Sequence, residues 1–552
     1  MRYPILQGMT PRAYVLAVAA GLGLADASIV TLALPDILRE LDTSVEGVAA
    51  VIGVYTVVLA IALIPFERAA SAFSVRAVGA GGFALFAVAS AACAGADDLT
   101  GLLVARCAQA VGAAAGLATV FDLLGGAGPG RRLWLGAAVF ATALGPAVGG
   151  ALTEAFDWRA IFVFQVPVAA AGAIAVLAGP AHAPAPPAPE RPERFALRPA
   201  LALALVSAAL AAVLFLLVLL LVAGWNVSPL SAAVAVTVIP LAALAGARLP
   251  GDPRTRAAGG CALVGGGVLA LAWLPGASLW WTVIPQALAG VGMGLALTAL
   301  GGDLLPERTP RDAVRLLAVR HAGIAAILAI AAPIAAHQLD VSTQRAKERG
   351  VALVLDAPLA PQDKIKLAPT LLEGVDSDEP RAGLRRAVAS ERHTFAGRDR
   401  ATYDDLGQRA DDMLVAAVGE AFRSSFLLAG AAGLLAAALL VAGTQLAAMA
   451  AAGALTIGSP VAYVALHRAI APAPPAILDP CTAKRTLPKT GGVSGFLQEQ
   501  ALKLLDSAAC KAGSSREELV LALADKDEAK RFEREHGVNP RTAAGLLQVL
   551  LK

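Results

Sequence analysis

Four polar side chains interrupt stretches of the sequence that are otherwise apolar. Asp26 falls near the middle of the first stretch, Arg106 lies one turn into the fourth, and Gln109 follows Arg106 on the same helical face. Gln165 lies in the sixth stretch. Ionisable groups are costly in lipid and usually functional. Asp26 is therefore either a proton-binding or cation-contacting group, or a structural hydrogen-bond or ion-pair partner of Arg106, and Arg106 keeps its charge in either case.

Small residues recur in the fifth apolar stretch. Ala141, Gly145, Gly149 and Thr153 lie four residues apart and line one face of a predicted helix that has almost no side chain. A neighbouring helix can approach such a face until the backbones nearly touch. Pro146 removes one backbone donor and bends the helix. On these residues alone, this segment is either functional or a kinked packing helix and nothing more.

These residues stand in motifs that resemble those of the major facilitator superfamily. Gly145-Pro146-x-x-Gly149-Gly150 resembles its antiporter signature, and Arg106-x-x-Gln109-x-x-Gly112 resembles its fourth-helix motif. Three further segments resemble the drug:proton antiporter branch with fourteen helices: Ala25 to Pro35, Trp158 to Pro167, and Gly224 to Leu230. In that branch an Asn usually stands at the place of Gln165. The resemblance covers roughly residues 13–338 and 415–443, and it implies that Arg106 takes part in proton coupling.

The composition is that of a polytopic membrane protein. Hydrophobic residues make up 57% of the chain and charged residues 16%, and the net charge of +3 is too small to indicate a nucleic-acid partner. A stretch of about 20 apolar residues can cross a bilayer. Thirteen such spans are predicted: 13–34, 46–65, 77–95, 100–121, 133–153, 160–179, 199–223, 230–250, 258–275, 280–301, 314–337, 421–443 and 446–466. Cys93, Cys107 and Cys261 fall inside spans as small hydrophobic residues.

The distribution of arginines among the loops predicts the orientation of the protein in the membrane. With a cytoplasmic N-terminus, arginines concentrate in the cytoplasmic loops, as at Arg68, Arg76, Arg131, Arg132, Arg191, Arg194, Arg198, Arg248, Arg254, Arg256, Arg308, Arg311 and Arg315. Short external loops carry mainly acidic residues or no charge. This asymmetry predicts a multi-pass protein of the plasma membrane with its N-terminus in the cytoplasm.

The predicted fold is all-α, a major facilitator fold with two six-helix bundles, one extra C-terminal span and a small helical tail. The predicted boundaries are 1–179 for the first half, 180–198 for a Pro-rich cytoplasmic linker and 199–443 for the second half. Within the second half, residues 338–415 form a polar insert that is external by the parity of the spans. Short helices are predicted there at Ser342–Arg349 and Tyr403–Val418.

The extra span, 444–468, departs from the family pattern. It contains Pro460 and is followed by cations, so it either crosses the membrane or re-enters it. A true crossing places the tail, 469–552, outside the cell.

The tail reads as a small helical module. Amphipathic helices are predicted at Phe496–Ala509, Ser515–Ala524 and Thr542–Leu551, with Ser514 as a cap. An external module of this size would gain from a disulfide between Cys481 and Cys510, whereas a cytoplasmic tail would hold two free thiols.

One family motif is damaged. The loop between spans two and three has Ser71 where the family has Asp, and Glu67 and Ser74 where it has Gly. That Asp forms a charge lock between the halves in the family, so its loss puts the usual gating in doubt.

The predicted function is a proton-coupled transporter, an exporter of small amphipathic molecules or drugs by alternating access. Its cavity and coupling residues would be Asp26, Arg106, Gln109 and Gln165. The alternative is a transport-inactive scaffold or sensor that presents the insert and the tail. Neither is an enzyme, neither requires a cofactor or metal, and the expected partners are lipid, protons and a small-molecule substrate bound by a monomer. Walker A, dinucleotide and Cys/His metal motifs do not occur in the sequence.

Overall fold

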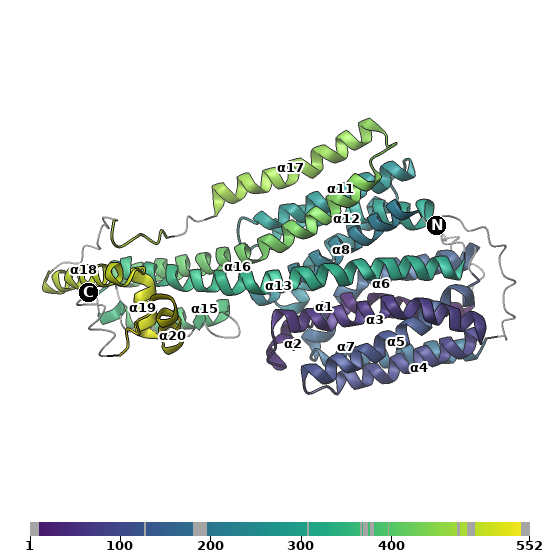
Figure 1. The fold of residues 1–552 in the computed structure, drawn as a ribbon, viewed down its shortest axis with the longest axis horizontal. Helices are drawn as coiled ribbons and strands as arrows, with labels where there is room; N and C mark the ends of the chain where they lie inside the picture. Colours follow the sequence, from purple (N-terminus) through teal and green to yellow (C-terminus); the bar gives the residue numbers. More distant parts are fainter. Residues whose placement is uncertain are drawn as a thin grey trace. The chain divides into compact units, whose positions relative to one another are not determined.

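The computed structural model describes residues 10–125, 128–179, 196–305, 309–360, 362–364, 367, 374–375, 380–395, 397–471, 475–482 and 492–542. Within these ranges every regular element is a helix (Figure 1). Twelve helices are long and apolar enough to cross a bilayer. Helix α6 (Gly128–Ala155), of 28 residues, corresponds to the remaining predicted span. The predicted all-α fold class is confirmed.

The first half contains six long helices. They are α1 (Pro11–Thr31), α3 (Val45–Ala72), α4 (Val75–Ala94), α5 (Leu99–Leu123), α6 and α7 (Arg159–Leu177), and a short helix, α2 (Leu34–Glu40), follows α1. Side-chain caps begin three of them, since Ser44, Ser74 and Asp98 accept hydrogen bonds from backbone N–H groups of α3, α4 and α5. These caps occur at short turns, and they explain why the helices start where apolar periodicity predicts.

The second half has more irregular helices. They are α8 (Leu197–Leu219), α9 (Pro229–Val236), α10 (Val238–Ala247), α11 (Pro253–Ala270), α12 (Trp280–Ala299), α13 (Pro310–Asp356) and α16 (Gly397–Leu440). Single turns of π-helix extend α8 and α12, at Leu220–Gly224 and Leu300–Leu304, and a 3-10 turn at Leu271–Trp273 extends α11. The predicted span at 230–250 is divided between α9 and α10.

The extra span is one continuous helix, α17 (Leu446–Ile470). It lies beside α11, where a Cβ added to Gly266 would be 2.6 Å from Thr456 Cα (Figure 1). The Tyr463 hydroxyl donates a 2.6 Å hydrogen bond to the Trp281 carbonyl. At about 1.5 Å per residue the helix exceeds the roughly 30 Å hydrocarbon core, which favours a crossing over re-entry.

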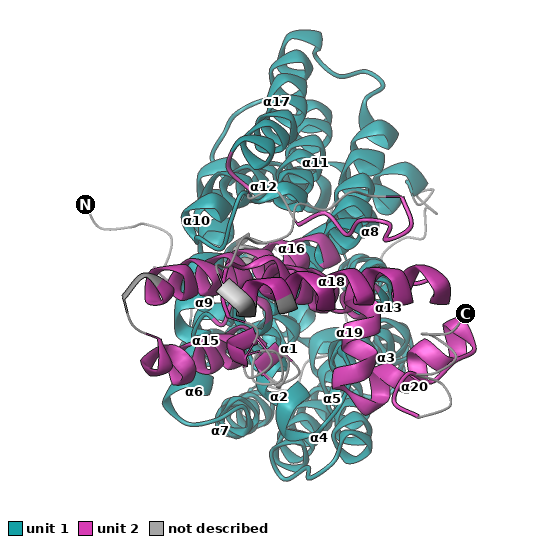
Figure 2. Ribbon diagram, turned by 90° about the vertical axis from the view of Figure 1, so that its left-hand side faces the viewer, with its two compact units in different colours: residues 1–223, 227–337, 422–469 teal, residues 224–226, 338–421, 470–552 magenta. Residues whose placement is uncertain are grey.

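Two compact units emerge from the contacts, and they divide the chain differently from the predicted boundaries. Unit 1 contains residues 1–223, 227–337 and 422–469, whereas unit 2 contains residues 224–226, 338–421 and 470–552 (Figure 2). Unit 2 therefore combines the insert with the tail. The separate helices expected at Ser342–Arg349 and Tyr403–Val418 are instead continuous parts of α13 and α16.

Besides these extensions, the described part of unit 2 contains α15 (Pro380–Glu391), α18 (Gly492–Ala512), α19 (Arg516–Ala524) and α20 (Lys526–His536). The predicted cap at Ser514 is wrong by one residue, because Ser515 and Glu518 form the capping box of α19. Helix α20 was not predicted from the sequence. The predicted helix at Thr542–Leu551 lies almost wholly outside the described residues.

Ion pairs, each with one buried partner, and a disulfide hold unit 2 together. Arg381 and Arg385 both bind Asp411, with four N–O distances of 2.9 to 3.1 Å. Arg516 is fully buried in the tail and reaches Asp356 of α13 at 2.9 Å. A disulfide joins Cys481 to Cys510. The Arg516–Asp356 pair connects segments 160 residues apart, so the tail is packed against the insert.

Candidate functional site

The four polar residues singled out in the sequence lie in one ring inside unit 1, which is formed by three hydrogen bonds and one ion pair. Asp26 Oδ2 is 2.6 Å from Arg106 Nη1, and both side chains are fully buried. Arg106 Nη1 donates to Gln109 Oε1 at 2.5 Å, and Gln109 Nε2 donates to Gln165 Oε1 at 2.6 Å. Gln165 Nε2 closes the ring by donating to Asp26 Oδ1 at 2.9 Å. Helices α1, α5 and α7 therefore meet through these side chains.

The ion pair in this ring is close but not fully hydrogen-bonded. Asp26 Oδ2 accepts no aligned hydrogen bond despite its 2.6 Å approach to Arg106 Nη1, and Arg106 Nη2 has no hydrogen-bond partner among the described residues. Arg106 Nε donates to the Val51 carbonyl of α3 at 3.1 Å. Asp26 Oδ2 and Arg106 Nη2 are therefore the two atoms of the ion pair that could still form a hydrogen bond with another group.

Aromatic rings and hydroxyls complete the surroundings of Arg106. Its guanidinium carbon lies 4.4 Å from the centroid of the Tyr55 ring and 5.7 Å from that of Phe162. Ser90 Oγ accepts from Gln109 Nε2 at 2.8 Å. Cation–π contacts of this kind stabilise a cation that has left water. Tyr55, Phe162 and Ser90 could not be predicted from the sequence, because one Tyr, Phe or Ser in an apolar span carries no signal of its own.

The small-residue face of α6 lies against the helix that carries Asp26. A Cβ added to Gly145 would overlap the Ser28 hydroxyl, and one added to Gly149 would overlap the Ile29 carbonyl oxygen. Gly150 faces another way, where an added Cβ would overlap the Ala233 side chain of α9. Thr153 is buried, and the side chain of Ala141 lies outside the described residues. The face therefore contacts α1 within one turn of the ring.

A cavity of about 100 Å³ lies next to this contact inside unit 1. Ala27, Ser28 and Thr31 of α1 and Pro146 of α6 line it from the first half. The second half contributes mainly aliphatic side chains from α8, α10 and α13. The cavity thus lies between the two halves, and α1 forms part of its wall one residue after Asp26.

Three polar groups enter the cavity from the second half. Ser207 has a buried Oγ without a hydrogen-bond partner among the described residues, and Arg320 also lines the cavity. His321 is 5% exposed, and its Nδ1 lies 2.8 Å from the Leu317 carbonyl. Arg320 and His321 therefore both lie at the cavity.

Among the described residues, the damaged loop motif forms no charge lock. Ser71 Oγ donates back to the Glu67 carbonyl of its own helix at 2.6 Å, and Arg76 donates to the Leu177 carbonyl of α7. Glu67, Arg68 and Arg76 form no ion pair with the described residues. The loop therefore connects α4 to α7 through backbone groups rather than through opposite charges.

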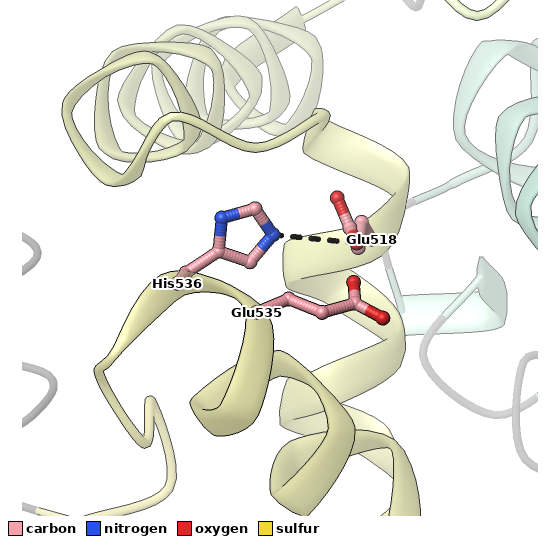
Figure 3. Close-up of side chains that lie close together, drawn as sticks. All are labelled: Glu518, Glu535 and His536. Carbon is pink, nitrogen blue, oxygen red and sulfur yellow. Dashed lines mark ion pairs between the residues drawn. The ribbon is translucent and has the colours of Figure 1, made fainter.

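A separate cluster of possible metal ligands lies in unit 2. The ligand atoms of Glu518, Glu535 and His536 all lie within 4.8 Å of one another, and His536 Nε2 is 3.3 Å from Glu518 Oε1 (Figure 3). Glu518 already serves the capping box with Ser515 and lies 4.0 Å from Arg531. An ion pair that closes the end of α20 against α19 accounts for this geometry without a metal.

Comparison with known proteins agrees with this geometry. The family model described as Major Facilitator Superfamily matches residues 16–335, more than half of the chain. The multidrug resistance protein Stp of Mycobacterium tuberculosis is 34% identical over 164 residues, covering 28% of this chain and 30% of Stp. The methylenomycin A resistance protein of Bacillus subtilis is 30% identical over 167 residues, covering 29% of this chain and 36% of that protein. These matches span only about a third of each relative.

A solved structure supports the fold. A bacterial homologue of the human lysosomal transporter Spinster, in an inward-facing and unoccupied conformation, aligns with a TM-score of 0.55. The alignment covers 82% of this chain and 99% of that chain at 14% identity. At this identity the likeness concerns the fold alone.

Proposed function

Since this chain belongs to the Major Facilitator Superfamily, we propose that it is a proton-coupled transporter that exports small amphipathic molecules by alternating access. The observation that carries the proposal is the buried ring of Asp26, Arg106, Gln109 and Gln165 beside a cavity between the halves. The resemblance of the chain to relatives named for drug resistance supports export of drug-like molecules.

The proton step takes place at Asp26. When Asp26 is ionised, its charge is compensated by Arg106, which cannot release its own proton. When Asp26 binds a proton, Arg106 keeps its bonds to Gln109 and the Val51 carbonyl but loses its counter-charge. Loss of one partner of a buried ion pair costs about 3–5 kcal/mol, which is enough to favour another arrangement of the helices.

The rearrangement reaches the substrate through α1. Asp26 lies on this helix, Ala27, Ser28 and Thr31 line the cavity, and Ser28 and Ile29 contact the glycine face of α6. Because the backbones of α1 and α6 touch there, a shift of α1 relative to α5 must also move α6 or break the contact. Proton binding and cavity shape are coupled in this way.

The chemistry of the cavity suggests the class of substrate. Its lining is mostly aliphatic, with hydroxyls from Ser28, Thr31 and Ser207 and a cation from Arg320. An amphipathic molecule with a hydrogen-bond acceptor or a negative charge at one end fits such a lining.

Energised inside-out vesicles test the proposal. Vesicles that contain the protein should accumulate a lipophilic fluorescent dye when a pH gradient is applied, and an uncoupler should release the dye. Anionic, neutral and cationic dyes should be compared, with vesicles lacking the protein as the control. If no dye accumulates above that control, the protein is not such an exporter.

A second candidate function is a scaffold or sensor that does not transport. Two observations favour it, namely the absence of ion pairs from the described 67–76 loop and the organisation of the insert and tail into one folded unit. In this case the vesicles show no accumulation, although the protein is inserted and unit 2 is folded.

The proposed setting is the plasma membrane, with the N-terminus in the cytoplasm and unit 2 outside. The cation asymmetry of the loops supports this orientation. The disulfide of unit 2 supports it independently, because disulfides persist in oxidising compartments. The protein would act there as a monomer with lipid, protons and substrate as its partners.

A further inference from the structure

We propose that unit 2 binds a single-chain amphipath with an anionic headgroup, in an apolar cavity that the insert and the tail build together. The cavity has a volume of about 260 Å³ and is lined by α13, α15 and α16 of the insert and by α18 and α19 of the tail. Binding in unit 2 does not depend on whether unit 1 transports.

The cavity wall is almost entirely aliphatic. It includes Val351, Met413 and Leu414 from the insert and Leu505 and Leu523 from the tail. Protein interiors are normally packed without voids of this size, since the atoms that line an empty space lose their contacts on one side. A smaller engineered apolar cavity of about 150 Å³ stays dry and binds benzene. A hydrocarbon chain is therefore the occupant that best restores the missing contacts.

One cationic side chain at this cavity determines the charge expected of the ligand's headgroup. Lys364 lines the cavity, is 6% exposed, and donates from Nζ to the Leu355 carbonyl at 2.6 Å. It forms no ion pair with a carboxylate of the described residues, so its other N–H donors are available to a ligand. By contrast, Lys347 also lines the cavity but pairs with Glu528 at 3.3 Å.

The charged side chains near Lys364 are bound to one another, so an anionic ligand can pair with Lys364. Asp356 lies nearby but is bound by Arg516 at 2.9 Å, and Arg516 is in turn bound to Glu517. The pKa of Lys364 is lowered to about 8, mainly by burial; Asp356 opposes the shift and Arg516 contributes to it. A carboxylate or phosphate at the end of the hydrocarbon chain would supply Lys364 with a counter-charge of its own, whereas Asp356 is shared with Arg516.

A glycine at the cavity makes the proposal easy to test. Gly350 lines the cavity on α13, and a Cβ added there would meet only Met413 Cε, at 3.6 Å. Because the Cβ at this position overlaps no backbone, Gly350→Phe is expected to place its ring in the cavity, and the loss of a helical glycine favours the helix. Gly419 of α16 is the matched control, because an added Cβ would meet nothing within 4 Å and the residue does not line the cavity.

The experiment is photolabelling of the full-length protein in lipid nanodiscs. A twelve-carbon fatty acid with a diazirine on its chain is compared with the corresponding alcohol, and labelled peptides are located by mass spectrometry. We expect the acid to label unit 2 peptides around Val351, Met413 and Leu505, at least five-fold more than the alcohol. Gly350→Phe should reduce this labelling at least five-fold, whereas Gly419→Phe should not.

Two further arms keep the result decisive. Lys364→Gln should lower labelling by the acid to the level seen with the alcohol, and it should leave labelling by the alcohol unchanged. The ratio of acid to alcohol labelling tests the headgroup independently of the Gly350 variant. Unlabelled dodecanoate and dodecyl phosphate distinguish a carboxylate from a phosphate by which competes better, whereas dodecanol should not compete. Labelling confined to unit 1, or equal unit 2 labelling in wild type and Gly350→Phe, would overturn the proposal. Equal labelling by the acid and the alcohol would overturn the proposal that the headgroup is anionic.

Discussion

Asp26 of α1 and Arg106 of α5 form a fully buried ion pair, 2.6 Å apart. The pair is bridged a second time, because Gln165 and Gln109 connect the same two side chains by hydrogen bonds. A charge that changes within this ring therefore acts on α1, α5 and α7 at once.

The contact between α6 and α1 should tolerate no side chain at Gly149. Gly149→Leu places a bulky group where even a Cβ overlaps the Ile29 carbonyl oxygen. Such overpacking costs roughly 1–3 kcal/mol or more, so the melting temperature should fall or one conformation should be locked. Thermal unfolding in detergent measures the first effect and dye transport the second.

Gly136→Leu is the control on the same helix, since nothing lies within 4 Å of a Cβ there. It should leave both stability and transport near wild-type values. If Gly149→Leu is equally harmless, the glycine face does not pack as the structure indicates.

The ion-pair cluster of unit 2 should be necessary for its stability. Asp411→Ala leaves Arg381, which is 11% exposed, without its carboxylate. Loss of one partner of a buried pair costs about 3–5 kcal/mol, so backbone amides around α15 should exchange with deuterium 100-fold faster or more. Hydrogen exchange followed by peptide mass spectrometry measures this.

The neighbouring pair of Arg409 and Asp405 provides the comparison. Both side chains are more than half exposed, so Asp405→Ala should change exchange very little. Equal exchange in Asp411→Ala and Asp405→Ala would show that the cluster contributes nothing to unit 2.

Ligands with an anionic headgroup should dissociate from unit 2 as the pH rises. The pKa of Lys364 is lowered to about 8 by burial, and its ammonium form, the one that attracts an anion, predominates below that value. Labelling by the photoreactive fatty acid should therefore be strong at pH 7 and weak at pH 10, with a midpoint at or above 8 because a bound anion favours the charged lysine. Labelling by the alcohol should be equal at pH 7 and pH 10. Labelling of the Lys364→Gln variant by the acid should also be equal at the two pH values. A pH-independent signal from the acid would show that Lys364 does not hold the headgroup.

Unit 2 should be accessible from outside the cell. A membrane-impermeant thiol reagent, applied to intact cells after mild reduction, should label Cys481 and Cys510. Cys93 and Cys261 are buried in membrane helices and serve as internal controls that should stay unlabelled. Labelling of Cys481 and Cys510 only after lysis would place unit 2 in the cytoplasm, and the disulfide would then have to be abandoned.

The sequence predicted the long helices and the individual polar residues, because both are local signals. Apolar runs of span length and an Asp or Arg within them are visible one segment at a time. The sequence could not show that Gln165 bridges Asp26 and Gln109, since this depends on the packing of helices up to 139 residues apart. For the same reason Ser207 and Tyr55 carried no signal.

Unit 2 illustrates the same limit. The insert and the tail each looked like short polar helices, and only long-range contacts such as Arg516–Asp356 join them into one unit. Helix α20 was missed because it is highly charged, although its ends do carry local signals. Asp525 accepts hydrogen bonds from the N–H groups of Asp527 and Glu528, and Gly537 ends the helix at a φ of +72°.

Substrate-driven proton movement in proteoliposomes tests the role of Asp26 and Arg106 most directly. A pH-sensitive dye in the lumen should report proton flux when a transported dye is added to liposomes that contain wild-type protein. Asp26→Asn and Arg106→Ala should each abolish this flux while the protein remains inserted and folded, and Asp97→Asn, a change at an exposed loop carboxylate, should not. Proton flux at the wild-type level in Asp26→Asn or Arg106→Ala would contradict the account.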